Sequence, residues 1–182
     1  IGEEVARLLA AEFIREIYHS EWLANVVMVP KKDKSLRMCI DFKHINQSYP
    51  KDHFPLPRID QIVNSTAECE CLSFLDAYSG YHQIRLYGPD EIKIAFITPF
   101  GCFCYVTMLS GLKNAGATFM RMIQKCLLTQ IRRNVEAYMD DIVVKSRKGS
   151  DLLTDLAETF ANLRRYDIKL NTSKCTFGVP GG

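Results

Sequence analysis

Two adjacent aspartates, Asp140 and Asp141, lie between two apolar stretches and constrain the fold more than any other feature of the sequence. The residues before them, Val135–Met139, and after them, Ile142–Lys145, are typical of β-strands. Because aspartate is disfavoured inside a strand, the pair is predicted to occupy the tight turn of a β-hairpin. Taken alone, the pair is equally compatible with an ordinary solvated turn, where aspartate is common.

A third aspartate, Asp76, follows the apolar run Leu72–Leu75, which is predicted to be a buried strand. An unpaired carboxylate there is costly and needs a cation or hydrogen bonds, although a helix cap or a turn would also explain it. If this strand and the predicted hairpin are neighbours in one sheet, three carboxylates converge. Oxygen ligands without a nearby histidine or cysteine suit Mg²⁺, and two such ions can support phosphoryl transfer.

Strands and helices are predicted to interleave without a regular βαβ order, which indicates an α+β fold. Apolar residues at three- and four-residue steps predict a first helix that runs from Val5 to Ile17. The other expected elements are strands over Asn25–Val29, Leu36–Phe42, Leu72–Leu75, His82–Leu86, Ile92–Thr98 and Phe103–Met108, and helices over Arg58–Thr66, Ala115–Ile131 and Leu152–Arg165.

Composition excludes some classes of protein and leaves the partner open. The formal net charge of +2 is compatible with nucleic-acid binding but is too small to indicate it. Seven cysteines without a signal peptide favour reduced thiols inside a cell, and the two Cys-x-Cys pairs lack the spacing of a zinc site. No apolar run approaches the roughly 18 residues of a membrane span. Both ends of the chain are abrupt, so a piece of a longer product is expected.

A set of short motifs occurs in a fixed order along nearly the whole chain. The stretches are Trp22–Val27, Arg37–Phe42, Phe54–Asp60, Ser79–Ile84, Ala95–Thr98, Gly111–Phe119, Tyr138–Asp141, and Asn171 followed by Lys174–Phe177. Each is weak by itself, but together and in this order they are specific. The chain resembles the reverse transcriptase region of gypsy-type LTR retrotransposon Pol polyproteins, and Tyr138-Met139-Asp140-Asp141 resembles their polymerase motif.

The resemblance implies a right-hand polymerase without its thumb, in which an antiparallel palm sheet packs on helices. Fingers are expected over approximately 1–65 and 88–107, and palm over 66–87 and 108–182. The implied activity is that of an RNA-directed DNA polymerase, a nucleotidyltransferase that joins a dNTP to a primer 3′-hydroxyl on an RNA or DNA template. The implied partners are template–primer, dNTPs and the remaining Pol segments (thumb, connection, RNase H and integrase), without a membrane, in a cytoplasmic virus-like particle.

The resemblance also assigns the acidic residues and two positions near the nucleotide. Asp76 and Asp140 resemble the catalytic aspartates that bridge two Mg²⁺ ions, for which Mn²⁺ can substitute, and Asp141 resembles a more peripheral third ligand. Tyr81 resembles the aromatic residue under the incoming sugar, where a ring would clash with a 2′-hydroxyl and select deoxyribonucleotides. Taken alone, Tyr81 is equally compatible with a core aromatic. Ala77 is expected to contact the dNTP.

Basic residues are implied at the triphosphate. Lys31, Lys32 and Arg37 lie on a predicted hairpin, and a lysine and an arginine of this hairpin bind the triphosphate in related enzymes. The spacing does not decide between the two lysines, and the same residues alone describe a solvated basic turn. Gly111 and Lys113 resemble a segment that supports template and nucleotide, although Lys113 alone is also compatible with a solvated residue at a helix start.

Two departures from the family pattern concern the nucleotide pocket. Leu109-Ser110 stands where the family usually has Pro-Phe, which removes a rigid turn and an aromatic ring, and Ile94 stands where threonine is common. These departures favour one alternative, a catalytically inactive retroelement relic that only binds nucleic acid weakly. A second alternative is a different metal-dependent phosphoryl-transfer enzyme such as a nuclease.

Overall fold

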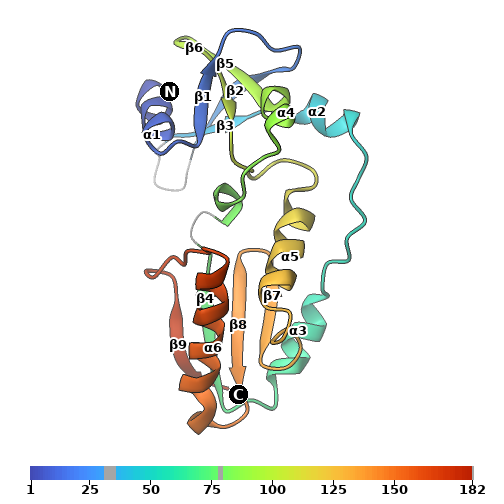
Figure 1. Ribbon diagram of the computed structural model, residues 1–182, viewed down its shortest axis with the longest axis vertical. Coiled ribbons are helices and arrows are strands. Elements are labelled where there is room, and N and C mark those ends of the chain that lie inside the picture. Colours follow the sequence, from blue (N-terminus) through green and yellow to red (C-terminus); the bar gives the residue numbers. More distant parts are fainter. Residues whose placement is uncertain (31–35, 78–79, 182) are drawn as a thin grey trace. The chain divides into compact units, whose positions relative to one another are not determined.

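The computed structural model describes residues 1–30, 36–77 and 80–181. They form two compact units, each assembled from two separate stretches of the chain (Figure 1). Unit 1 comprises Ile1–Lys51 and Tyr81–Ala115, and unit 2 comprises Asp52–Gly80 and Gly116–Gly182. The assignment of fingers to 1–65 and 88–107, and of palm to the remainder, stays a prediction. In the described ranges, no helix combines the length and apolar character that a bilayer span requires.

Unit 1 is built on a five-stranded sheet with the order β1-β6-β5-β2-β3. Only the pairing of β2 with β5 is parallel among these described strands; the other neighbours are antiparallel. The elements are α1 (Gly2–Ala10), β1 (Ile14–Ile17), β2 (Leu23–Pro30), β3 (Leu36–Ile40), α2 (Lys43–Ser48), α4 (Gly88–Glu91), β5 (Ala95–Thr98) and β6 (Gly101–Tyr105), with 3₁₀ turns at Gly80–Gln83 and Ile92–Ile94. The expected hairpin of the second and third strands is confirmed by the β2–β3 register.

The core of unit 1 lies between α1 and its sheet. Val5 and Leu8, three residues apart on one face of α1, are buried against the aromatic side chains of the sheet. Phe96 is fully buried, and its ring lies 5.5 Å from that of Tyr105, centroid to centroid. This cluster gives the short strands a common apolar face to pack on.

Unit 2 contains a four-stranded antiparallel sheet with the order β7-β8-β4-β9 (Figure 1). The elements are α3 (Ile59–Thr66), β4 (Cys71–Asp76), α5 (Ala115–Cys126), β7 (Val135–Tyr138), β8 (Asp141–Ser146), α6 (Leu152–Arg165) and β9 (Thr176–Pro180). Along β8, Ile142 and Val144 are fully buried, whereas Asp141 is exposed. This alternation shows that one face of the sheet is the core face, as the period of two along a strand requires.

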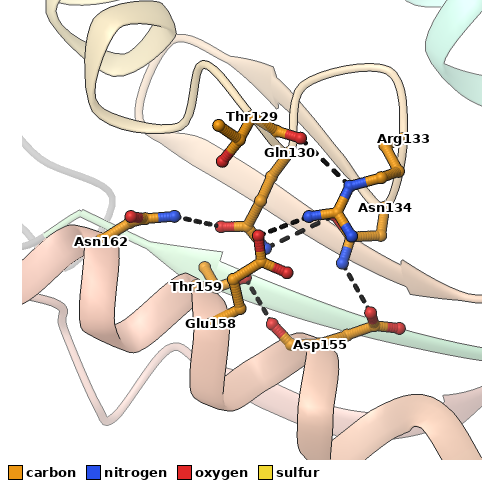
Figure 2. A network of polar contacts seen from close by, with 8 residues as sticks. All are labelled: Thr129, Gln130, Arg133, Asn134, Asp155, Glu158, Thr159 and Asn162. Carbon is orange, nitrogen blue, oxygen red and sulfur yellow. Dashed lines mark hydrogen bonds and ion pairs between the residues drawn. The ribbon is translucent and has the colours of Figure 1, made fainter.

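A polar network joins α6 to the connection between α5 and β7, and Figure 2 shows it. Gln130 is fully buried, yet its amide donates to Thr159 Oγ1 at 3.0 Å and accepts from Asn162 Nδ2 at 2.9 Å. Asp155 accepts from Asn134 Nδ2 at 2.6 Å through one carboxylate oxygen and from Ser146 Oγ at 2.7 Å through the other. Because buried polar groups are costly only when unsatisfied, the network holds α6 in one position on the sheet without a desolvation penalty.

The first helix is shorter than expected. It ends at Ala10, Glu12 takes a left-handed conformation (φ 55°), and Ile14–Ile17 is a strand paired with β6. The predicted helix over Val5–Ile17 is therefore wrong in its second half. Phe13 and Ile17 are four residues apart, which matches a helical period, but in the structure Ile14 and Ile17 are the two buried ends of β1, an edge strand of the sheet.

Two further expectations need correction. The predicted strand over His82–Leu86 is a 3₁₀ turn at Gly80–Gln83 followed by a single bridge between Arg85 and Thr107. The predicted helix over Ala115–Ile131 ends at Cys126, because the chain then turns through hydrogen bonds from Gln130 and Ile131 to the Leu127 carbonyl. Local hydrophobic patterns could not indicate the tight turns that interrupt these segments.

Candidate active site

Strand pairing brings the three predicted aspartates together in unit 2. Asp76 is the last residue of β4 and lies directly opposite Asp141, the first residue of β8. Facing residues of antiparallel strands have Cα atoms roughly 4.5–5.5 Å apart. Asp140 precedes Asp141 in the β7–β8 turn, and its carbonyl accepts a hydrogen bond of 2.9 Å from the amide of Ala77. The condition set by the sequence, that the Asp76 strand and the hairpin are neighbours, is met.

The turn that carries Asp140 has an unusual backbone. Tyr138 pairs with Asp141, so only Met139 and Asp140 connect β7 to β8, and Met139 has φ 52°. A positive φ at the first central residue is characteristic of the mirror-image turns of tight hairpins, and it strains a residue other than glycine. The amide of Met139 lies 3.0 Å from Met120 Sδ. The predicted hairpin is thus confirmed, with the correction that Asp141 already belongs to β8.

Asp140 is in an environment that opposes its negative charge. Burial raises the pKa of its carboxyl group, the neighbouring carboxylates of Asp76 and Asp141 raise it further, and Lys174 acts in the opposite direction. Among the residues that the structure describes, Asp140 Oδ1 is the one buried side-chain nitrogen or oxygen without a hydrogen-bond partner. A buried oxygen without a hydrogen-bond partner is unusual in a folded protein, and a role as a ligand of a cation would explain it.

Gly80 packs closely against this carboxylate. A Cβ atom at Gly80 would lie 2.7 Å from Asp140 Oδ1 and 3.0 Å from the Phe119 ring. Since real Cβ contacts are essentially never below 3.0 Å, only glycine fits without displacing the aspartate or the fully buried Phe119. The glycine therefore helps to confine the Asp140 side chain.

Lys174 supplies the positive charge next to the aspartates. Its Nζ lies 3.4 Å from Asp76 Oδ2, and the backbone holds the segment in place because the amide of Asn171 donates to the Asp76 carbonyl at 2.8 Å. The Lys174 side chain is 65% exposed and can move away, whereas that of Asp76 is only 19% exposed. Sequence reasoning placed Lys174 in a matching motif but gave it no role, because nothing local indicates a contact with a residue 98 positions away.

The carboxylates fit a divalent cation in their chemistry. They are oxygen donors without a coordinating histidine or cysteine, they repel one another, and one buried oxygen is unsatisfied. Across the described part of the chain, however, no three His, Cys, Asp or Glu side chains are arranged as a closed metal cluster. Asp76 and Asp140 are thus the residues that could hold an ion, and Lys174 compensates part of their charge in the arrangement seen.

The remaining predicted residues are divided between the two units. Ala77 is buried in unit 2 next to Asp76 and forms a bridge with Leu170. In unit 1, Tyr81 lies in the 3₁₀ turn that follows Gly80, and Arg37 is exposed on β3 opposite Val29. Lys31 and Lys32 lie outside the described residues.

Gly111 and Lys113 also belong to unit 1, where they contact its own backbone. Gly111 has φ +98°, a conformation that glycine adopts at little cost. Lys113 Nζ donates to the carbonyls of Asn46 and Tyr49, both at 2.9 Å.

The two departures from the family pattern are absorbed by the core of unit 1. Leu109 is 7% exposed and Ile94 is 4% exposed, and both pack in the cluster that contains Phe96. Ser110 is exposed beside them. The two aliphatic replacements, Leu109 and Ile94, are therefore accommodated in the apolar core of unit 1, whereas Ser110 is not part of it.

Comparison with known proteins defines the family. The family model described as "Reverse transcriptase (RNA-dependent DNA polymerase)" matches residues 29–180. The chain belongs to this family. Relatives include the Transposon Tf2-3 polyprotein of Schizosaccharomyces pombe, 34% identical over 177 residues and 97% of this chain, and the Retrovirus-related Pol polyprotein from transposon 412 of Drosophila melanogaster, 34% identical over 183 residues and 97% of this chain. The chain spans only 13% and 15% of these two relatives.

Solved reverse transcriptase structures share the fold. The native protease–reverse transcriptase of prototype foamy virus superposes with a TM-score of 0.84 at 21% identity, covering 98% of this chain and 24% of that protein. The foamy viral enzyme in complex with an RNA/DNA hybrid gives a TM-score of 0.83 at 18% identity, covering 95% of this chain and 23% of that protein. The expected α+β arrangement of a reverse transcriptase fingers and palm is thereby confirmed.

Neutralising Asp140 is predicted to stabilise the metal-free chain. Because the folded-state pKa of Asp140 is raised, its ionised form costs stability above that pKa, and the cost vanishes as the pH falls through it. Asp140→Asn should raise Tm at pH 7 by about 2–4 °C, the shift that roughly 1 kcal/mol produces in a domain of this size. The gain should shrink toward pH 4. Thermal unfolding with EDTA measures it, with the exposed Asp60→Asn as control; a lower Tm for Asp140→Asn would contradict the assignment.

Proposed function

We propose that this chain is the fingers-and-palm part of an RNA-directed DNA polymerase, which transfers a nucleotide from a dNTP to a primer 3′-hydroxyl on an RNA or DNA template. The observation that carries the proposal is the β4–β8 register, which sets Asp76 opposite Asp141 with the unsatisfied Asp140 Oδ1 beside them. Membership of the reverse transcriptase family supports it. The reaction breaks the bond between the α- and β-phosphates, so that pyrophosphate leaves.

Asp76 and Asp140 would hold two Mg²⁺ ions, or Mn²⁺ in their place, and Asp141 would contribute from the periphery. Bound ions of this kind lower the pKa of the attacking hydroxyl and balance charge on the leaving oxygen. The protein's own contribution is to fix the two carboxylates: Asp76 through the β4–β8 pairing, and Asp140 through the strained turn and Gly80. With an ion held there, the exposed ammonium of Lys174 would no longer be needed beside Asp76 and could turn to solvent.

The residues proposed to bind the nucleotide are those that the resemblance to reverse transcriptases indicates. Arg37, exposed on β3, offers a planar fork that suits the oxygens of a triphosphate, and Lys31 or Lys32 would add a second positive charge. Tyr81 is proposed to lie under the sugar and Ala77 beside the nucleotide. Template and primer are proposed as nucleic-acid partners, consistent with the foamy viral enzyme bound to an RNA/DNA hybrid. The remaining Pol segments, in a virus-like particle, would complete the enzyme.

A catalytically inactive relic is the second candidate. It is favoured by Leu109, Ser110 and Ile94, which depart from the family pattern in the loop and strand expected near the nucleotide. The core of unit 1 accommodates Leu109 and Ile94, so a folded but inactive chain is physically possible. Only a measurement of nucleotide incorporation separates the two candidates.

Primer extension tests the polymerase directly. A longer polypeptide, in which this chain is followed by the Pol segments of its relatives, should extend a DNA primer on an RNA template with Mg²⁺. Asp140→Asn should reduce the rate by at least about 100-fold, since it removes a group that acts in the transition state. Asp60→Asn is the matched control. No extension by the wild type would support the relic, and equal rates for wild type and Asp140→Asn would refute the assigned site.

Tyr81 is predicted to select the sugar. Tyr81→Ala should raise the efficiency of ribonucleotide incorporation relative to deoxyribonucleotide by about 10-fold or more, because the clash with the 2′-hydroxyl is removed. The ratio of kcat/KM for ATP and dATP measures the effect, and Tyr81→Phe, which keeps the ring, should behave as the wild type. An unchanged ratio in Tyr81→Ala would exclude this role.

A further inference from the structure

The loop before α5, residues 108–114, is held on the end of α2 inside unit 1. We call this segment the pre-helix loop. Asn46 of α2 contacts it twice: its Nδ2 donates to the Gly111 carbonyl at 2.7 Å, and its Oδ1 accepts from the Lys113 amide at 2.8 Å. Asn114 Nδ2 donates to the Pro50 carbonyl at 3.0 Å. Contacts from Gly111 to Asn114 therefore fix this part of the loop on the segment from Asn46 to Pro50.

The Lys113 side chain points back into this contact. Its Nζ donates to the carbonyls of Asn46 and Tyr49, each at 2.9 Å, and lies 5.7 Å from the centroid of the Tyr49 ring. The last carbonyls of a helix lack partners within the helix and carry partial negative charge, so a cation there is favourable. Two of the three ammonium donors of Lys113 are thus used to cap α2.

Tyr49 connects the two sides. Its hydroxyl accepts from the Lys113 amide at 3.0 Å and donates to Asn46 Oδ1 at 2.8 Å. Burial raises the pKa of Tyr49, and the amide N–H groups of Lys113 and Asn114 oppose that rise. The hydroxyl is therefore integrated into the network rather than solvated, and removing it alone should loosen the loop without changing any charge.

The loop itself has little freedom to move once these bonds are made. At one end, Met108 and Leu109 are buried in unit 1. In the middle, Gly111 has a positive φ that most residues avoid. At the other end, the amide of Ala115 donates to the Leu112 carbonyl at 3.1 Å. The apolar core does not hold the remaining side of the loop. The hydrogen bonds of Lys113 and Tyr49 hold it there instead.

We propose that Lys113 is a positioning residue, which fixes the pre-helix loop to the end of α2 and does not bind a template or nucleotide phosphate. The inference rests on the proposed polymerase function, because the loop matters there as the segment expected to support template and nucleotide. It replaces a direct role for the lysine, which the family resemblance suggested, by an indirect one. Loosening the loop would weaken nucleic-acid binding without removing a phosphate contact.

The contact itself is tested by amide hydrogen exchange on the free chain. Lys113→Met keeps the length of the side chain without its charge, and Tyr49→Phe removes one oxygen. Both should increase exchange at the amides of residues 111–115, and Lys113→Met also at the end of α2. The exposed Lys43→Met, at the first residue of α2, should leave these amides unchanged. Unchanged exchange in Lys113→Met and Tyr49→Phe would overturn the proposal, whatever the chain does with nucleic acid.

The salt dependence of template binding distinguishes positioning from contact. A lysine that contacts a phosphate contributes about one unit to the slope of log K against log [salt]. Lys113→Met should lower affinity for an RNA/DNA hybrid by about fivefold, the equivalent of one hydrogen bond, at every salt concentration, with the slope of the wild type. Tyr49→Phe should weaken binding in the same direction, and Lys43→Met should change it least.

Two results would decide against the proposal in this assay. A slope reduced by about one in Lys113→Met, with wild-type binding by Tyr49→Phe, would show that Lys113 contacts a phosphate. Equal affinity of both variants and the wild type would show that template binding does not depend on these contacts, which would overturn the proposed role of Lys113 in binding. Absence of salt-dependent binding by the wild type would instead count against the polymerase function, and the exchange experiment would still decide whether Lys113 holds the loop.

Discussion

Repulsion between three carboxylates is the constraint on which the candidate site depends. The sheet of unit 2 sets Asp76 and Asp141 opposite each other, and the tight β7–β8 turn places Asp140 next to them. Each carboxylate opposes the ionisation of Asp140, and burial adds to the cost. A proton or a cation relieves this repulsion, and in the structure the Lys174 ammonium does so in part.

Packing and hydrogen bonds elsewhere in unit 2 hold the strands that carry the aspartates. Ile142 and Val144 anchor β8 in the core, and the network around Gln130 and Asp155 attaches α6 without leaving a buried polar group unsatisfied. The aspartates are thus held on the ends of paired strands rather than on a free loop. Geometric precision of this kind is what a site for nucleotidyl transfer requires, since its catalysis consists mainly of positioning and charge stabilisation.

Sequence reasoning was most successful where a local pattern and the tertiary structure agree. The hairpin around Asp140, strand β4 and helix α6 were predicted with nearly the observed bounds. In β8 and α6 the apolar pattern coincides with one buried face, whereas in β4 Ser73 is fully buried and Phe74 is 43% exposed. Sequence reasoning failed over Ile14–Ile17, because the four-residue step from Phe13 to Ile17 fits a helix, whereas the structure has a short strand paired with β6. The roles of Asp76, Asp140 and Asp141 came from the family resemblance combined with their chemistry.

Contacts between distant residues could not be predicted from the sequence. Lys174 pairs with Asp76, and Lys113 donates to the carbonyls of Asn46 and Tyr49. The partners lie far apart in the sequence, so no local pattern indicates these contacts. In both cases a lysine that looks solvated in the sequence has a specific anionic or carbonyl partner. The fold, and not the lysine itself, therefore decides whether such a residue binds solvent, the protein's own chain or a ligand.

The most direct measurement is the anomalous scattering of Mn²⁺ in crystals of the chain grown with that ion. The account predicts a peak within coordination distance, roughly 2.1 Å, of carboxylate oxygens from both Asp76 and Asp140, with the Lys174 ammonium displaced from Asp76. Crystals in which Mn²⁺ is absent from these aspartates at saturating concentration, while Lys174 keeps its ion pair, would contradict the account.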